Sequence, residues 1–126
     1  MAPGSGIRVI LVEDNDVFRE SLELVLGLEG GIEVVGAVGT GHDGVALCER
    51  ERPLVALVDY RLPDLDGVET TRAIRTASPI TAVVALTAAA DDPELAALRA
   101  AGAAACLRKD LPVADIVAVI REAAGG

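Results

Sequence analysis

The stretch VALVDYRLPDLDG at residues 55–67 decides the fold of this chain. It is a short apolar run that ends in an acid, Asp59, and passes into a loop containing proline and glycine. With Leu54 in front of it, the run Leu54–Val58 is typical of a strand in a parallel sheet covered on both faces, because such strands have no polar side. Four other apolar or alternating runs are predicted to be strands: Val9–Val12, Ile32–Val35, Ala82–Leu86 and Ala103–Leu107.

Segments with the apolar spacing of helices lie between and after these runs. Their apolar faces are marked by Phe18–Leu26, Val45–Cys48, Val68–Ile74, Leu95–Leu98 and Val113–Ile120. Because strand and helix alternate five times, we predict an α/β fold with a doubly wound, five-stranded parallel sheet. This is the flavodoxin-like (βα)5 arrangement, with strand order 2-1-3-4-5.

Length and composition indicate a single folded domain. The chain has 126 residues, of which 52% are hydrophobic and 25% charged, which excludes a disordered chain. We expect the domain at residues 7–124, a flexible arm at 1–6 and the start of a linker at 125–126. Eleven basic and twenty acidic residues give a net charge of −9, which disfavours direct binding to nucleic acid. No apolar run approaches the ~20 residues of a membrane helix, so we expect no membrane insertion.

The two cysteines, Cys48 and Cys106, have no metal-ligand spacing and form no dense framework. We interpret them as small hydrophobic residues in a reducing compartment, and therefore expect a cytoplasmic protein.

Polar residues interrupt the apolar pattern where the predicted strands end. Glu13 and Asp14 follow the first strand, Asp59 the third, Thr87 the fourth and Lys109 the fifth. Because the carboxyl ends of parallel strands share one edge of the sheet, and neighbouring strands lie about 4.8 Å apart, these five residues are expected to converge.

Three carboxylates placed together repel one another, and one lysine cannot neutralise them. A hard divalent cation is therefore implied, and Mg²⁺ fits because it takes one or two carboxylates together with water and phosphate oxygens. A metal-bound carboxylate beside a threonine and a lysine suits phosphoryl transfer to an aspartate nucleophile.

Taken singly, each of these residues has an ordinary structural explanation. Glu13 and Asp14 could cap a helix, Thr87 could be a β-branched strand residue and Lys109 a solvated lysine. Their coincidence at one edge favours a functional site.

Three other polar residues are given structural roles only. Asp64 and Asp66, in the loop after Asp59, are expected to cap the following helix. His42, the single histidine, lies in a glycine-rich turn. It is expected to have no carboxylate or cysteine partner and is interpreted as a surface residue.

The segments with these residues resemble the receiver domain of two-component response regulators. They read ILVEDNDVFRESL, VALVDYRLPDLDG, VVALTA and GAAACLRKDLP, and the resemblance extends from Ile7 to about Glu122. GIEVVGAVGTGHDGVAL and LRKDLPVADIVAVIR look most like the subgroup with a LuxR-type helix-turn-helix effector.

The resemblance implies that Asp59 is the phosphoacceptor, supplied by a histidine kinase. It also implies that Mg²⁺ is held by Asp14, Asp59 and the backbone carbonyl of Arg61, with Glu13 reaching it through water. The chain would then be a signalling switch with its own phosphorylation chemistry, not a turnover enzyme.

By the same resemblance, Thr87 and Lys109 contact the phosphoryl group, and Arg61 and Ala89 tune how fast phosphoaspartate hydrolyses. The implied partners are a histidine kinase and a second copy of the chain, with DNA contacted only through an effector domain absent from this sequence.

Two positions depart from the family pattern. Glu13 stands where aspartate is commoner, which keeps an oxygen ligand. Cys106 stands where the family usually has Tyr or Phe, and a cysteine cannot swing a ring inward. The aromatic part of the usual switch is therefore in doubt, whereas movement of Thr87 is not.

Alternative functions differ in what they require. A phosphatase with an aspartate nucleophile looks like it needs a second aspartate two residues after that nucleophile. This chain has Arg61 at that position. A flavin phosphate would be repelled by the acids around Glu13 and Asp14. The remaining alternative is a receiver-like dimerisation module in which phosphorylation is incidental, and Cys106 gives it some weight.

Overall fold

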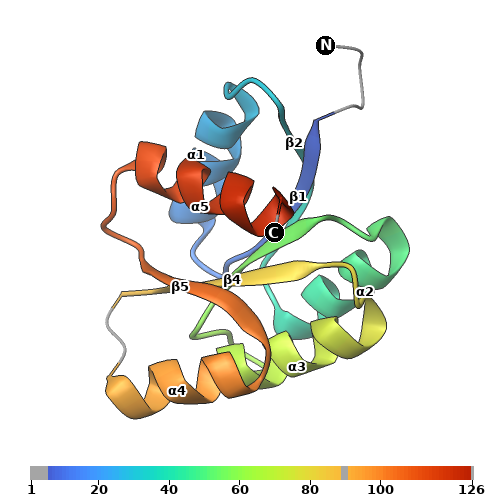
Figure 1. The fold of residues 1–126 in the computed structure, drawn as a ribbon, viewed down its shortest axis with the longest axis vertical. Coiled ribbons are helices and arrows are strands. Elements are labelled where there is room, and N and C mark those ends of the chain that lie inside the picture. Colours follow the sequence, from blue (N-terminus) through green and yellow to red (C-terminus); the bar gives the residue numbers. More distant parts are fainter. Residues whose placement is uncertain (1–5, 89–90, 126) are drawn as a thin grey trace.

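The computed structural model describes residues 6–88 and 91–125 (Figure 1). Five strands alternate with five helices along these residues. The strands are β1 (Ile7–Val12), β2 (Ile32–Val38), β3 (Val55–Asp59), β4 (Ala82–Thr87) and β5 (Ala103–Arg108). The helices are α1 (Asp16–Gly27), α2 (Gly41–Glu51), α3 (Gly67–Ala77), α4 (Asp92–Ala100) and α5 (Val113–Gly125).

The strands form one parallel sheet in the order β2-β1-β3-β4-β5. Helices α1 and α5 cover one face of the sheet, and α2, α3 and α4 lie on the other (Figure 1). The predicted doubly wound topology is therefore confirmed, including the strand order.

Side chains of β1 point alternately to the two faces of the sheet and enter two separate cores. Val9 and Leu11 pack with apolar residues of α1 and α5. Ile10 and Val12 pack with residues of α2 and α3, among them the fully buried Cys48. Because both faces are covered by helices, the central strands β1 and β3 need no polar side, which explains their apolar runs Val9–Val12 and Val55–Val58.

Backbone hydrogen bonds continue the sheet beyond the ends of its strands. The amide of Glu13 donates to the carbonyl of Val38 at 2.9 Å, and the amide of Lys109 donates to the carbonyl of Thr87 at 2.9 Å. These bonds hold the first residue after β1 and the first residue after β5 against neighbouring strands. Residues that follow the strands are thereby kept at the carboxyl edge.

The flexible arm predicted at residues 1–6 and the linker start predicted at 125–126 remain predictions. Residues 1–5 and 126 lie outside the described residues, and α5 continues through Gly125, the first residue of the predicted linker. Within the part of the chain that is described, no helix combines the length and apolar character needed to span a bilayer.

Candidate functional site

Lys109 joins the ends of β5, β3 and β1 in one ion-pair network. Its Nζ atom lies 2.6 Å from Glu13 Oε1 and 3.1 Å from Asp59 Oδ1. Both acids are buried, with exposed fractions of 2% for Glu13 and 4% for Asp59. The lysine stem therefore crosses the end of β4 and points inward, toward the acids of the neighbouring strands.

Asp14 completes a group of three carboxylates. One oxygen each from Glu13, Asp14 and Asp59 can be chosen so that all lie within 4.8 Å of one another. Asp14 is exposed, whereas the other two acids are buried, so the group opens to solvent on the Asp14 side. Oxygen donors gathered around one point with access from water are what a hard divalent cation requires.

The charges of this group are poorly balanced. Burial and the neighbouring Glu13 carboxyl raise the pKa of Asp59 to about 7, although Lys109 acts in the opposite direction. Burial lowers the pKa of Lys109, but its interactions with Glu13 and Asp59 outweigh burial and raise it above its ordinary value. The ammonium therefore stays charged at neutral pH and faces two buried carboxyl groups, which leaves negative charge for a cation to offset.

The two oxygens of the Glu13 carboxylate have different partners. Its Oε2 atom accepts a hydrogen bond from the Asn15 amide at 3.0 Å. Its Oε1 atom is buried and makes the ion pair with Lys109 but no well-aligned hydrogen bond. This buried oxygen has acceptor capacity beyond the ion pair, so a cation, or a water bound to one, fits as a further partner.

Thr87 and Arg61 lie beside this group on neighbouring segments. Thr87 is the last residue of β4, buried, and its carbonyl anchors the Lys109 backbone. The Arg61 amide donates to Asp59 Oδ1 at 3.2 Å, so the loop after β3 turns back toward the Asp59 carboxylate. Ala89, expected from the family resemblance to tune hydrolysis, lies outside the described residues.

Two residues of α1 support the site and were missed by sequence reasoning. The Phe18 ring lies under Lys109, with Nζ 5.1 Å from the ring centroid, a cation–π contact. Arg19 donates to the carbonyl of Glu13 at 2.7 Å and pairs with Asp16 at 2.7 Å. From the sequence, Phe18 was assigned only to the apolar face of the first helix. The feature that could have placed Phe18 and Arg19 at the site is their position about one helical turn after Glu13 and Asp14.

The expectations for Asp64 and His42 were partly wrong. Asp66 does cap α3, in a capping box with Glu69, as expected. Asp64 instead accepts hydrogen bonds from the amides at the start of α2, and it also contacts the His42 ring. His42 is an exposed residue, as expected, but it has a carboxylate beside it. The contact joins residues 22 apart in sequence, so no local pattern could reveal it.

Cys106 is half-buried in β5, where it is paired in register with Ala85. Burial raises the pKa of its thiol, so it is a neutral side chain at physiological pH. Nothing at this position provides the ring that the family pattern would lead one to expect.

The sequence matches known proteins along nearly its whole length. A family model described as response regulator receiver domain matches residues 9–121. The response regulator GacA of Pseudomonas viridiflava is 34% identical over 115 residues, which cover 91% of this chain and 54% of GacA. The transcriptional regulatory protein NarL of Mycobacterium tuberculosis is 36% identical over 122 residues, covering 95% of this chain and 56% of NarL. The chain thus spans about half the length of these curated relatives.

The fold is also found among solved structures. The signal receiver domain of NarL from Mycobacterium tuberculosis superposes with a TM-score of 0.92 at 32% identity, covering 97% of this chain and 98% of that domain. The whole described sheet, with its helices, therefore has a counterpart in a solved signalling domain.

Proposed function

Because this chain belongs to the response regulator receiver domain family, we propose that Asp59 accepts a phosphoryl group from a histidine kinase of a two-component system. The relatives GacA and NarL are regulators of the LuxR type, which agrees with the subgroup expected from the sequence. The observation that carries the proposal is the contact of Lys109 with both Asp59 and Glu13 at the open edge of the sheet. A half-buried lysine that contacts two acids, with a third acid beside them, suits the binding of an anionic phosphoryl group together with a cation.

The proposed reaction is a displacement at phosphorus. A carboxylate oxygen of Asp59 forms a bond to the phosphorus of a phosphohistidine, while the bond from phosphorus to the imidazole nitrogen breaks. The nitrogen keeps the electron pair of that bond. Lys109 first holds the Asp59 carboxylate in place and then contacts a phosphoryl oxygen, and the Thr87 hydroxyl donates to another. Donors placed where charge develops lower the barrier to transfer.

Glu13, Asp14, Asp59 and the Arg61 carbonyl are proposed to hold Mg²⁺, with Glu13 acting through water. The unused acceptor capacity of the buried Glu13 Oε1 and the three gathered oxygens support this assignment. A bound magnesium ion would offset the carboxylate charge and the charge of the phosphoryl oxygens. The chain's own contribution is to keep the acids together, chiefly through Lys109.

Output is proposed to pass through a segment outside this sequence. The family consists of signalling modules, and the relatives are about twice as long as the matched region. We propose that phosphorylation favours one arrangement of Thr87 and its loop, which changes self-association and thereby a DNA-binding effector domain. The proposed setting is the cytoplasm, where a histidine kinase and DNA are both accessible.

Phosphorylation of Asp59 is tested by incubating the chain with a small acyl phosphate and Mg²⁺ and measuring intact mass. We expect wild type to gain the mass of one phosphoryl group, since Asp59 is the buried nucleophile next to Lys109. Asp59→Asn should gain none, because an amide oxygen is a poor nucleophile. The matched control is Asp66→Asn, which alters an acid of the same loop that caps α3.

Equal labelling of wild type and Asp59→Asn would refute phosphoacceptance at Asp59. A labelled wild type whose self-association is the same with and without the phosphoryl group would favour the alternative function, a dimerisation module in which phosphorylation is incidental.

Magnesium is expected to stabilise the fold even without a phosphoryl donor. At ten times its dissociation constant, a ligand that binds only the folded state adds about 1.4 kcal/mol, or about 5 °C in melting temperature for a chain of this size. Thermal melting with and without Mg²⁺ measures the shift. Sodium chloride at matched ionic strength is the control, and an equal shift from sodium would contradict a specific cation site.

A further inference from the structure

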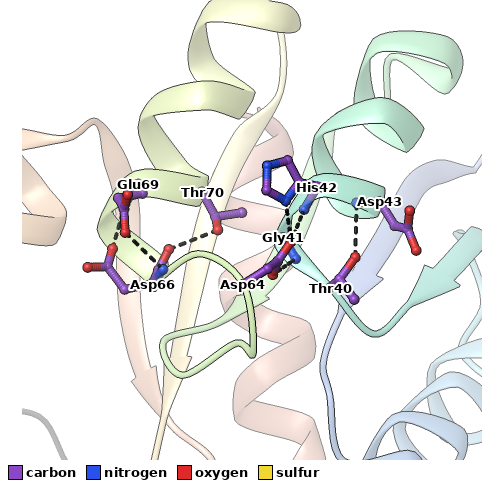
Figure 2. A network of polar contacts seen from close by, with 8 residues as sticks. All are labelled: Thr40, Gly41, His42, Asp43, Asp64, Asp66, Glu69 and Thr70. Carbon is purple, nitrogen blue, oxygen red and sulfur yellow. Dashed lines mark hydrogen bonds and ion pairs between the residues drawn. The ribbon is translucent and has the colours of Figure 1, made fainter.

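The loop between Asp59 and α3 is tied to a second helix that takes no direct part in the site. Asp64, in the middle of this loop, accepts hydrogen bonds from the Gly41 amide at 2.7 Å and the His42 amide at 2.9 Å (Figure 2). Its Oδ2 atom also lies 2.5 Å from His42 Nδ1. One carboxylate thus joins the loop to the first turn of α2 through three contacts.

Asp64 holds this position as a carboxylate. The His42 amide, with further help from the Gly41 amide, keeps the pKa of Asp64 well below its ordinary range. A negative charge also suits the first turn of α2, where free amides and the helix dipole favour anions. The N-cap of α2 is Thr40, whose side chain accepts a hydrogen bond from the Asp43 amide. Asp64 supplements this cap by accepting from the two preceding amides, those of Gly41 and His42.

Gly41 allows the helix to approach the loop this closely. A Cβ atom at Gly41 would lie 2.8 Å from Thr70 Oγ1 and 2.9 Å from Leu65 Cβ. Real Cβ atoms essentially never come so near their neighbours, so any side chain at this position would push α2 away from the loop. Gly41 and Asp64 therefore both support the contact between α2 and the loop: Gly41 leaves room for it, and Asp64 forms its hydrogen bonds.

The other polar contacts described for the loop lie at its two ends, while Leu62 adds apolar packing against the core. At its ends, the Gly67 amide donates to the Tyr60 carbonyl at 2.7 Å, and Arg61 forms an isolated bridge with Asp66. Between these ends, the contact of Asp64 with α2 is the polar link that restrains where the loop lies. Arg61, whose carbonyl is a proposed cation ligand, is only three residues away from Asp64.

We propose that Asp64 is a positioning residue, which docks the loop on α2 and thereby holds the Arg61 carbonyl where a cation at the three carboxylates can use it. This inference rests on the proposed function for the identity of the cation site. It assigns α2, through Gly41, a part in cation binding, although the helix contributes no ligand.

The experiment is a Mg²⁺ titration without any phosphoryl donor. Tyr60, the single tyrosine in a chain without tryptophan, follows Asp59 directly and provides the fluorescence signal. Asp64→Ala is expected to raise the Mg²⁺ concentration at half-saturation about tenfold, the lower end of what loss of an outer-shell partner costs. Gly41→Ala should raise it similarly without any change of charge. Asp64→Asn keeps one acceptor oxygen and should therefore raise the Mg²⁺ concentration at half-saturation less than Asp64→Ala does. It replaces Gly41→Ala as the second variant if Gly41→Ala does not fold.

Two control variants separate positioning from charge and from stability. Asp43→Asn removes one charge from the same turn of α2 without touching the loop, and its midpoint should stay near that of wild type. Asp91→Ala removes a capping aspartate from α4 and should lower the melting temperature without moving the midpoint. A wild-type midpoint in Asp64→Ala, or an equal shift in Asp43→Asn, would overturn the proposal. If wild type bound Mg²⁺ but Asp59 were never labelled, phosphoacceptance would fail, while the titration would still decide the role of Asp64.

Discussion

Replacing Lys109 with methionine is expected to slow phosphorylation of Asp59 by at least about a hundredfold, the typical cost of removing one donor that stabilises the transition state. Lys109 is the ammonium that contacts both Asp59 and Glu13, at 3.1 Å and 2.6 Å. Methionine keeps much of the apolar stem of lysine but has no ammonium to lie over the Phe18 ring or to donate to a phosphoryl oxygen. The measurement is a time course of intact mass with an acyl phosphate at saturating Mg²⁺.

The same substitution should also lower the melting temperature in the absence of Mg²⁺. It leaves Glu13 and Asp59 buried without their shared cation, and an unpaired buried charge is costly. Arg108→Met is the matched control, because it removes a positive charge from the adjacent residue, which pairs with Asp110 outside the site. Labelling of Lys109→Met at the rate of Arg108→Met would show that Lys109 takes no part in the transfer.

Asp14→Asn is expected to weaken Mg²⁺ binding by at least about tenfold, while the metal-free protein melts no lower than wild type. Asp14 is exposed, and among the described residues its carboxylate makes no hydrogen bond or ion pair that the fold would lose. Its negative charge near Glu13 and Asp59 has no structural benefit in the absence of a cation. Magnesium titration and metal-free melting together measure the two effects.

Asp16→Asn is the control for Asp14→Asn, since it removes an exposed charge two residues later that pairs with Arg19. We expect it to leave Mg²⁺ binding nearly unchanged. A lower metal-free melting temperature for Asp14→Asn, together with unchanged Mg²⁺ binding, would mean that Asp14 is a structural residue.

The sheet and the residues at its edge were predictable because both depend on local sequence. Runs such as Leu54–Val58 have no polar side, so they could only be buried strands, and each acid or lysine that followed a run had to lie at the carboxyl edge. Parallel pairing then made Lys109 and Asp59 neighbours across β4, although 50 residues separate them in the sequence.

The supports of the site were not predictable in this way, because they depend on how helices pack. The contact of Asp64 with His42 requires α2 and α3 to lie side by side at a distance that Gly41 permits. Likewise, Phe18 has the apolar character of any helix core residue, and only the three-dimensional path of Lys109 places the ammonium over its ring. Sequence pattern identifies what lies at an edge, whereas side-chain partners across elements follow from tertiary packing.

Phosphoacceptance at Asp59 is tested most directly by a crystal structure grown with Mg²⁺ and beryllium fluoride, which stands in for the transferred phosphoryl group. We expect the beryllium to be bonded to a carboxylate oxygen of Asp59, with Lys109 and Thr87 contacting fluorine atoms and Mg²⁺ held by Asp14 and Asp59. Beryllium fluoride bound elsewhere, or Asp59 left unmodified with Lys109 still paired to Glu13, would contradict it.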